Sequence, residues 1–322
     1  MSAAWLSLRR RLLTPAAREA DLMHRGFRIK DAAARTVLET AGRTFLQGFA
    51  KAAGTVSPAA AHSGLEQVER PVRGFAYEGA AMAYALLAGL GSGPGLPAFL
   101  TGPAERHTYM VHVGAGWAMA RLPRFRWPRI TPPDPLLRWL ALDGFGFHQA
   151  YFHTERYVRR QYQHAPGFWP SPWRGTYCAQ VVDQGIGRAL WFVEGADPAA
   201  VADVIERFPA GRRSDLYSGA GLAATYATGA SRAELTAFRD RAGHHHPAVA
   251  QGSAFAAKAR LLAGTQTEAT AQATEVLCGL TPAEAADVTD QALLDLPGDG
   301  SRPAFAVWRD RISLRLAPSG RF

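Results

Sequence analysis

The segments LDGFGFHQA (142–150), DQGIGRALW (183–191) and YSGAGLAAT (217–225) share the pattern that decides the fold. Each has a glycine in third place, called the anchor here, and a second glycine two residues later. Similar segments are TAGRTFLQG (40–48), YEGAAMAYA (77–85), HVGAGWAMA (112–120) and AQGSAFAAK (250–258). Their anchors recur at intervals of 30 to 41 residues, which is typical of arrays of helical units.

Small residues accompany every anchor. Position +2 is always small, and position +3 is bulky and apolar in six of the seven segments. Glycine inside a helix costs about 0.5–1 kcal/mol relative to alanine, so its recurrence needs a cause. Close approach of a neighbouring helix is one cause, and a turn directly before a helix is the other. The seven anchors are Gly42, Gly79, Gly114, Gly144, Gly185, Gly219 and Gly252.

The pattern predicts an all-α protein in which about seven helical hairpins stack as an α-solenoid or a curved, toroid-like array. Helix-start signals lie between the anchors. Asp197-Pro198 is one, and capping boxes are predicted at Ser231–Glu234, Thr265–Glu268 and Thr281–Glu284.

One domain, 1–322, is expected. Two proline-rich stretches interrupt the period and are predicted to be loops. The expected parts are an N-terminal arm at 1–30, helical repeats at 31–296 with loop-rich insertions at 121–136 and 164–176, and a C-terminal tail at 297–322.

Composition favours a globular cytoplasmic protein. The chain has 322 residues, of which 48% are hydrophobic, and its two cysteines form no CxxC pair. Neither a signal peptide nor a membrane span is expected. An ordinary first helix is expected at the start, and the alternative is peripheral contact with the inner membrane face through Trp5, Leu6 and Leu8 beside Arg9–Arg11.

The net charge of +9 is unevenly distributed. Residues 121–174 hold nine arginines against three acidic residues, a balance of +6. Such a stretch suits an acidic partner or anionic lipid, and no nucleic-acid motif accompanies it, so nucleic acid is not expected as a partner.

Two residues depart from the repeat. His148 stands at position +4, where five segments have alanine, and Arg188 stands at +3. A catalytic hypothesis makes His148 an acid or base, Asp183 its orienting partner, and Arg188 an anchor for an oxygen-bearing group. The favoured alternative is structural: a buried histidine bonded to Asp143 or Asp183, and an arginine in an ion pair.

Further residues are candidates for lining a cavity, if the units curve around one. Polar residues often precede the anchor, where helix capping is an equally good explanation. For the aromatic residues, a place in the core is the better interpretation. The candidates are Glu78, His112, Asp143, Phe147, Tyr151, Gln184 and Trp191. No metal-binding motif is present, and the sequence identifies no cofactor.

LDGFGFHQAYF, DQGIGRALWFVEGADP and FPAGRRSDLYSGAGLAATYA resemble the family called domain of unknown function 1702, as do RRRLLTPAAREADLMHRGF and FAYEGAAMA. The resemblance covers nearly the whole chain. Its motif positions are Gly144, Gly146, His148, Tyr151, Asp183, Gly185, Gly187 and Arg188.

This resemblance, to the UnbL-type proteins that accompany enediyne polyketide synthases, implies a role in antibiotic biosynthesis: acting on or holding a polyene-derived intermediate during core formation. A hydrophobic polyene and other proteins of the enediyne cassette are then the expected partners. The alternative is a non-catalytic helical-repeat scaffold that docks a membrane or the synthase. Whether the protein is an enzyme stays open.

Overall fold

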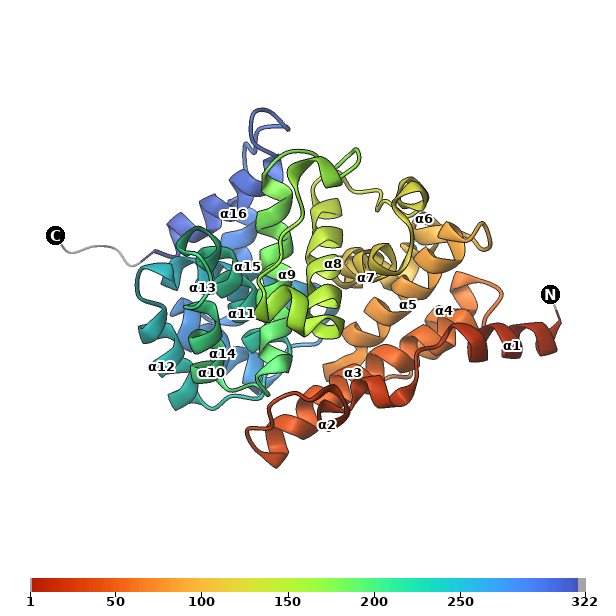
Figure 1. Ribbon diagram of the computed structural model, residues 1–322, viewed down its shortest axis with the longest axis horizontal. Coiled ribbons are helices and arrows are strands. Elements are labelled where there is room, and N and C mark those ends of the chain that lie inside the picture. The colour runs from red at the N-terminus through yellow and green to blue at the C-terminus, as the bar shows by residue number, and fades with distance from the viewer. Residues whose placement is uncertain (1, 318–322) are drawn as a thin grey trace.

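The computed structural model describes residues 2–317, and this part of the chain is helical without any strand (Figure 1). The all-α prediction is confirmed. Seven of the α-helices carry the repeated segments and are called the glycine helices here. They are α3 (Ala32–Ala53), α5 (Arg73–Gly89), α7 (Thr108–Arg121), α8 (Leu140–Phe152), α9 (Tyr177–Val193), α11 (Ala210–Tyr226) and α13 (His246–Ala263).

The glycine helices pack side by side in chain order, each against the previous and the next. The anchors lie inside the helices, not in turns before them. A Cβ added at Gly185 would lie closer than 3.0 Å to the carbonyl oxygen of Asp143 on α8, and one at Gly187 would do the same to Leu216 on α11. The two glycines therefore let α9 approach both neighbours at backbone contact distance.

The same contacts recur along the array. From α7 to α13, each anchor meets the carbonyl of the residue that precedes the anchor of the previous glycine helix. The first segment is an exception, and it corrects the register in which the seven repeated segments of this chain were compared. Gly42 faces Ala20 of the preceding segment, whereas Gly48 meets the carbonyl of Ala76 on α5. Gly48 is thus the +2 glycine of α3, which shifts the register of this unit by four residues.

Other helices cover the glycine helices from outside. Helix α5 is buried along nearly its whole length, as expected for a helix that is apolar on every side. Helix α12 buries only Leu235, Phe238 and Ala242, a single stripe at helical spacing. The remaining α-helices are α1 (Ala3–Leu13), α2 (Leu22–Arg25), α4 (Pro58–Leu65), α6 (Gly95–Phe99), α10 (Pro198–Ile205), α12 (Arg232–Ala242), α14 (Glu268–Cys278), α15 (Pro282–Gln291) and α16 (Ala304–Arg315).

The helix-start predictions hold at three places and fail at one. Asp197 caps α10, and capping boxes begin α12 at Ser231 and α15 at Thr281. The box predicted at Thr265 is two residues too early, because Thr267 caps α14 and the Thr270 side chain completes the box.

The two predicted loop insertions contain short helical turns. Residues Arg124–Arg129 and Pro166–Phe168 form 3₁₀ helices. Between the two insertions, Glu155–Arg159 form one π-helical turn. No α-helix separates α7 from α8, or α8 from α9, so these two connections lack the partner helix of a hairpin.

The two ends of the chain form helices on opposite sides of the body (Figure 1). In the N-terminal arm, Arg9 on α1 donates hydrogen bonds to the carbonyls of Ala53 and Thr55. In the predicted tail, α16 packs against α13, and residues 318–322 lie outside the described part. No helix between residues 2 and 317 is long and apolar enough to cross a membrane.

Candidate functional site

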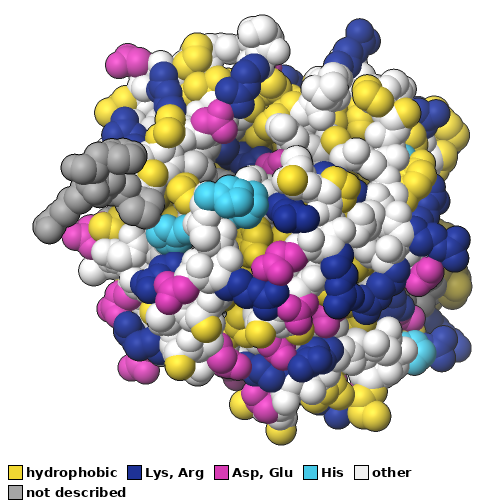
Figure 2. Space-filling model, turned by 60° about the vertical axis from the view of Figure 1, so that its left-hand side comes forward, with side chains coloured by type: hydrophobic (Ala, Val, Ile, Leu, Met, Phe, Trp, Pro, Cys, Tyr) yellow, Lys and Arg dark blue, Asp and Glu magenta, His cyan; other side chains and the backbone are white. Residues whose placement is uncertain are grey.

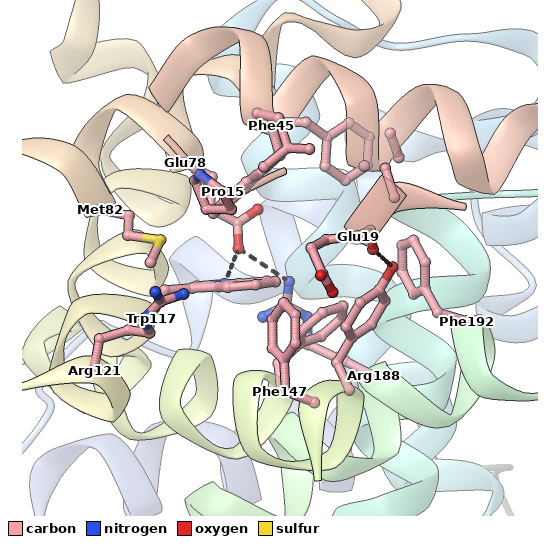
Figure 3. A pocket seen from close by; sticks show the side chains of 17 residues that line it. Pro15, Glu19, Phe45, Glu78, Met82, Trp117, Arg121, Phe147, Arg188 and Phe192 are labelled. Carbon is pink, nitrogen blue, oxygen red and sulfur yellow. Dashed lines mark hydrogen bonds and ion pairs between the residues drawn. The ribbon is translucent and has the colours of Figure 1, made fainter. Parts of the chain in front are cut away.

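A pocket lies between α3 and the facing sides of α5, α7, α8 and α9 (Figure 3). The space free of protein atoms in the pocket and at its mouth is about 660 Å³, which includes open solvent. From α3 it is covered by Ala41, Gly42, Phe45 and Leu46. The 3₁₀ helix at Ala17–Ala20 and the residues before it complete the rim.

The repeat itself builds the pocket wall. The glycines occupy the sides of each helix that touch its neighbours. Positions −1 and +3 lie one turn apart and share a different face of the helix. The +3 residues of four successive helices all line the pocket: Met82, Trp117, Phe147 and Arg188. Arg121, Tyr151 and Phe192 line the pocket four positions after Trp117, Phe147 and Arg188, and Phe75 lines it seven positions before Met82.

Aromatic rings form most of this wall. The Trp117 ring lies 4.4 Å from the Phe45 ring and 5.1 Å from the Phe147 ring, measured between centroids. Phe147 in turn meets Phe192 edge-on at 5.3 Å. Tyr151 closes one side, where its hydroxyl donates a hydrogen bond to the carbonyl of Glu19. The pocket is therefore suited to a flat, apolar ligand.

One side of the pocket holds a buried group of charges. The Arg188 guanidinium forms an ion pair with Asp143 Oδ1, and its Nη2 lies 3.9 Å from Glu78 Oε1. Trp117 Nε1 donates a hydrogen bond of 2.9 Å to the same Glu78 oxygen. All three charged side chains are less than a tenth exposed.

Burial controls how these groups hold protons. It raises the pKa of Glu78 to about 7, although Arg188 and the Trp117 hydrogen bond act in the opposite direction. It also raises the pKa of Asp143, again against Arg188. Burial disfavours the charge of Arg188, but the Asp143 and Glu78 carboxylates outweigh it and raise the pKa of the guanidinium. Glu78 is thus the group whose proton is exchangeable near neutral pH.

The family model described as "Protein of unknown function (DUF1702)" matches residues 4–316. The chain belongs to the DUF1702 family. No curated protein sequence and no solved structure matches it.

The DUF1702 structure brings together some of the residues predicted from sequence. Glu78, Phe147, Tyr151 and Arg188 line the pocket, and Asp143 lies directly behind it, paired with Arg188. Arg188 forms buried ion pairs, and its side chain also borders the cavity.

Three other predicted residues do not line this pocket. The His112 imidazole bonds through Nδ1 to the carbonyl of Thr108 on its own helix. Trp191 donates its indole N–H to the carbonyl of Thr228, away from the pocket. Gln184 is fully buried between neighbouring helices.

His148 and Asp183 are not brought together. Neither nitrogen of the His148 ring has a hydrogen-bond partner, so neither the expected orientation by Asp183 nor a bond to Asp143 is present. Asp183 instead forms a two-point ion pair with Arg212 at 2.9 and 2.5 Å. Burial lowers the pKa of His148 to about 3, so its ring is neutral, beside Trp117 and Phe152.

Sequence reasoning missed Trp117, Phe45 and Glu19 as site residues. The signal for Trp117 was available, since it stands at +3 like Phe147 and Arg188. The same signal was available for Phe45, which stands at +3 from Gly42 and at −1 in the corrected register of α3. Glu19 belongs to the arm, whose position over the pocket is a tertiary feature.

Metal binding finds no support in geometry. Among residues 2–317, no group of three or more histidine, cysteine, aspartate or glutamate side chains is arranged to hold a metal ion. The DUF1702 pocket offers aromatic surface and two carboxyl side chains, Glu19 at the rim and the buried Glu78.

Proposed function

We propose that this protein binds a hydrophobic, polyene-derived intermediate in the aromatic pocket and serves as an accessory protein in enediyne biosynthesis. The observation that carries the proposal is the wall of +3 and neighbouring aromatic side chains, Trp117, Phe147, Tyr151 and Phe192 among them, facing one cavity. Conjugated chains are flat and apolar, and stacking on aromatic rings suits them. The biosynthetic context follows from the resemblance of the sequence to proteins that accompany enediyne polyketide synthases.

The proposed architecture is a curved array of helical units with the pocket on its concave side. Repeated backbone contacts at the glycines support this proposal, because each contact reproduces the same helix-to-helix geometry. A concave wall built from equivalent positions can follow an extended ligand along several helices.

The test is co-expression with an enediyne polyketide synthase, followed by native mass spectrometry and absorbance of the purified protein. We expect a bound polyene in the wild type. Phe152 lines the pocket and is half-buried, so Phe152→Glu places a charge there with little damage to the core. This variant should emerge without the polyene.

The matched control is Phe168→Glu, which changes a half-buried phenylalanine outside the pocket. It should retain the ligand. Absence of bound polyene from the wild type, or equal amounts in Phe152→Glu and the wild type, would overturn the proposal.

A second candidate function is docking onto an anionic membrane surface through α1. Trp5, Leu8 and Leu12 are each about half exposed or more, and their spacing places them on one stripe of the helix. Arg10 and Arg11 on the same helix are also exposed and complement anionic headgroups. The arm continues directly into the rim of the pocket, so this contact would bring the pocket close to the lipid.

Vesicle co-sedimentation tests the docking function. The wild type should bind vesicles that contain phosphatidylserine and not vesicles of phosphatidylcholine alone. A triple change of Trp5, Leu8 and Leu12 to serine should abolish binding. Equal binding by this variant and the wild type would reject docking through α1.

A further inference from the structure

The Glu78 carboxyl has one engaged oxygen and one free oxygen. Oε1 accepts the hydrogen bond from Trp117 Nε1 and is the oxygen nearest to Arg188. Oε2 forms no hydrogen bond with any described residue and is not among the fully enclosed polar atoms without a partner. Glu78 is only 3% exposed and lines the pocket, so the free oxygen faces that cavity. Figure 3 shows the carboxyl pointing into the space between Trp117 and Arg188.

The charges around Glu78 do not balance when every group is ionised. Asp143 on α8 already forms the close ion pair with Arg188, the one cation in contact with both carboxylates. Tyr226 on α11 faces the same group with a neutral hydroxyl, and α3 contributes only uncharged residues to the pocket. Glu19 of the arm and Arg121 on α7 also line the pocket and carry one charge of each sign, so they leave the balance unchanged. Two carboxylates and one guanidinium carry a net charge of −1. Retaining a proton on Glu78 removes this excess from an apolar site.

The position of that proton follows from the hydrogen bonds. An oxygen that accepts an indole N–H and lies near a guanidinium is a poor place for a proton, since its lone pairs already face donors. The proton therefore sits on Oε2. A neutral carboxyl with its O–H directed into an aromatic cavity needs an acceptor, because an unpaired buried donor costs about 1–3 kcal/mol.

We infer that Glu78 is the polar anchor of the pocket and that its Oε2–H donates a hydrogen bond to a carbonyl oxygen on an otherwise apolar, conjugated ligand. This inference rests on the proposed binding function and adds the chemical class of the ligand to it. A linear polyene ketone fits the site, with its chain against Phe147 and Trp117 and its carbonyl at Glu78. A hydrocarbon polyene would leave the carboxyl without a partner.

The experiment compares two probes of equal carbon number: a linear conjugated trienone and the corresponding triene hydrocarbon. Their dissociation constants are measured by titration of the purified full-length protein. The absorption maximum of the bound trienone is recorded as well, because a hydrogen bond to a conjugated carbonyl shifts it to longer wavelength. The variants are Glu78→Met, which cannot donate, and Glu78→Gln, whose amide N–H donates at every pH.

For the wild type we expect the trienone to bind about tenfold more tightly than the hydrocarbon. Glu78→Met should lose this preference and the spectral shift while still binding the hydrocarbon. Its fold should survive because Arg188 stays paired with Asp143. The trienone affinity of the wild type should fall as pH rises through about 7, where Glu78 gives up its proton. Glu78→Gln should keep the preference and lose the pH dependence.

Two outcomes separate this inference from the function on which it rests. If both probes bind and Glu78→Met keeps the preference for the trienone, the pocket holds polyenes but Glu78 is not the anchor. If neither probe binds to the wild type, the polyene function itself fails, and the inference with it. A wild-type preference that does not change between pH 5 and 9 would also overturn the donor role of Glu78.

Discussion

The half of the molecule around α5–α9 and the half around α11–α16 use the same glycine contacts, yet one half encloses a pocket and the other a filled core. At position −1 the first half has Glu78 and Asp143, with Arg188 between them. The second half has Ser218 and Gln251, whose side chains form a hydrogen bond of 2.7 Å with each other. The backbone arrangement is shared, and the side chains and covering elements differ.

Helix α16 explains much of the difference. It covers the −1 and +3 face of α13, where Arg309 donates to Gln251 Oε1 and Trp308 packs on Phe255. In the part of the chain that the structure describes, α3 and the arm cover the face of Trp117 and Phe147 and leave the pocket between them. A repeated helix face thus becomes core or pocket according to what lies against it. On the face of the molecule seen in Figure 2, acidic and basic side chains interleave.

The largest effect is expected from a change that breaks the shared backbone contact. In Gly185→Ala the new Cβ would come closer than 3.0 Å to the Asp143 carbonyl and the Phe147 amide nitrogen, which cannot move without shifting α8. We expect a loss of about 5 kcal/mol, at the upper end for single substitutions. Thermal unfolding or soluble yield measures it. An unfolding midpoint equal to that of the wild type would mean that the glycine contacts are not needed.

The second largest loss of stability is expected from removing the arginine at the centre of each half. Arg188→Met leaves two buried carboxylates, Glu78 and Asp143, and should cost about 3–5 kcal/mol in the free energy of unfolding. Arg309→Met leaves Asp215, whose side chain is 15% exposed, and should cost less. Urea unfolding of both variants at pH 7 compares them. A larger loss for Arg309→Met would reverse our view of which half depends on its charges.

The third largest effect is expected from pH, because the half that holds the pocket contains the ionisable Glu78. The pKa of Glu78 is raised from its ordinary 4.5 to about 7, so its contribution to stability is full below pH 4.5 and is lost as pH rises through 7. The pKa difference corresponds to about 3 kcal/mol. Glu78→Gln should flatten this decline, which urea titrations between pH 4 and 8 would reveal. Parallel profiles for the variant and the wild type would rule out a raised pKa.

The uncharged pair Ser218 and Gln251, in the half around α11–α16, should contribute less to the free energy of unfolding. Ser218→Ala removes the hydrogen bond to Gln251 Oε1, which keeps the weaker bond from Arg309, and should cost about 1 kcal/mol. Ser214→Ala on the exposed side of α11 is the control; its hydroxyl shares a solvent-exposed hydrogen bond with His245, so its loss should cost less than that of Ser218. If the two serine variants unfold alike, the buried pair adds no stability.

The smallest change concerns a helical glycine outside the contacts. Gly211 on α11 has no atom within 4 Å of an added Cβ. Gly211→Ala should raise stability by about 0.5 kcal/mol through helix propensity alone. A calorimetric midpoint above that of the wild type would confirm this, in contrast to Gly185→Ala. Destabilisation by Gly211→Ala would show that a lack of close contacts does not make a helical glycine replaceable.

The close packing of the helices was predictable from the repeated glycine pattern in the sequence. The anchors at Gly144, Gly185 and Gly219 pointed to helices packed at close distance, and backbone contacts now account for them. The α3 register was not predictable, since Gly42 and Gly48 fit the pattern about equally well in a single segment. Only the contact of Gly48 with Ala76 distinguishes them.

The site was predictable in part. Departure from the repeat drew attention to Arg188, which lines the pocket, because a charge at a +3 position needs partners inside the structure. The same logic chose His148, which stands at +4 and rests among aromatic rings without a hydrogen bond. A departure at one position thus marked the pocket, and a departure one residue further along the helix did not.

The sequence by itself determined the helical class, most places of close backbone approach and three helix starts, because these depend on local propensity and on the absence of a side chain. Tertiary structure alone decided that Glu78, Asp143 and Arg188 meet, that α3 and the arm cover a pocket, and that α16 fills the opposite half. Such meetings join residues from different helices, and no spacing along one chain segment encodes the distance between two helices or the loss of water that shifts the pKa of Glu78.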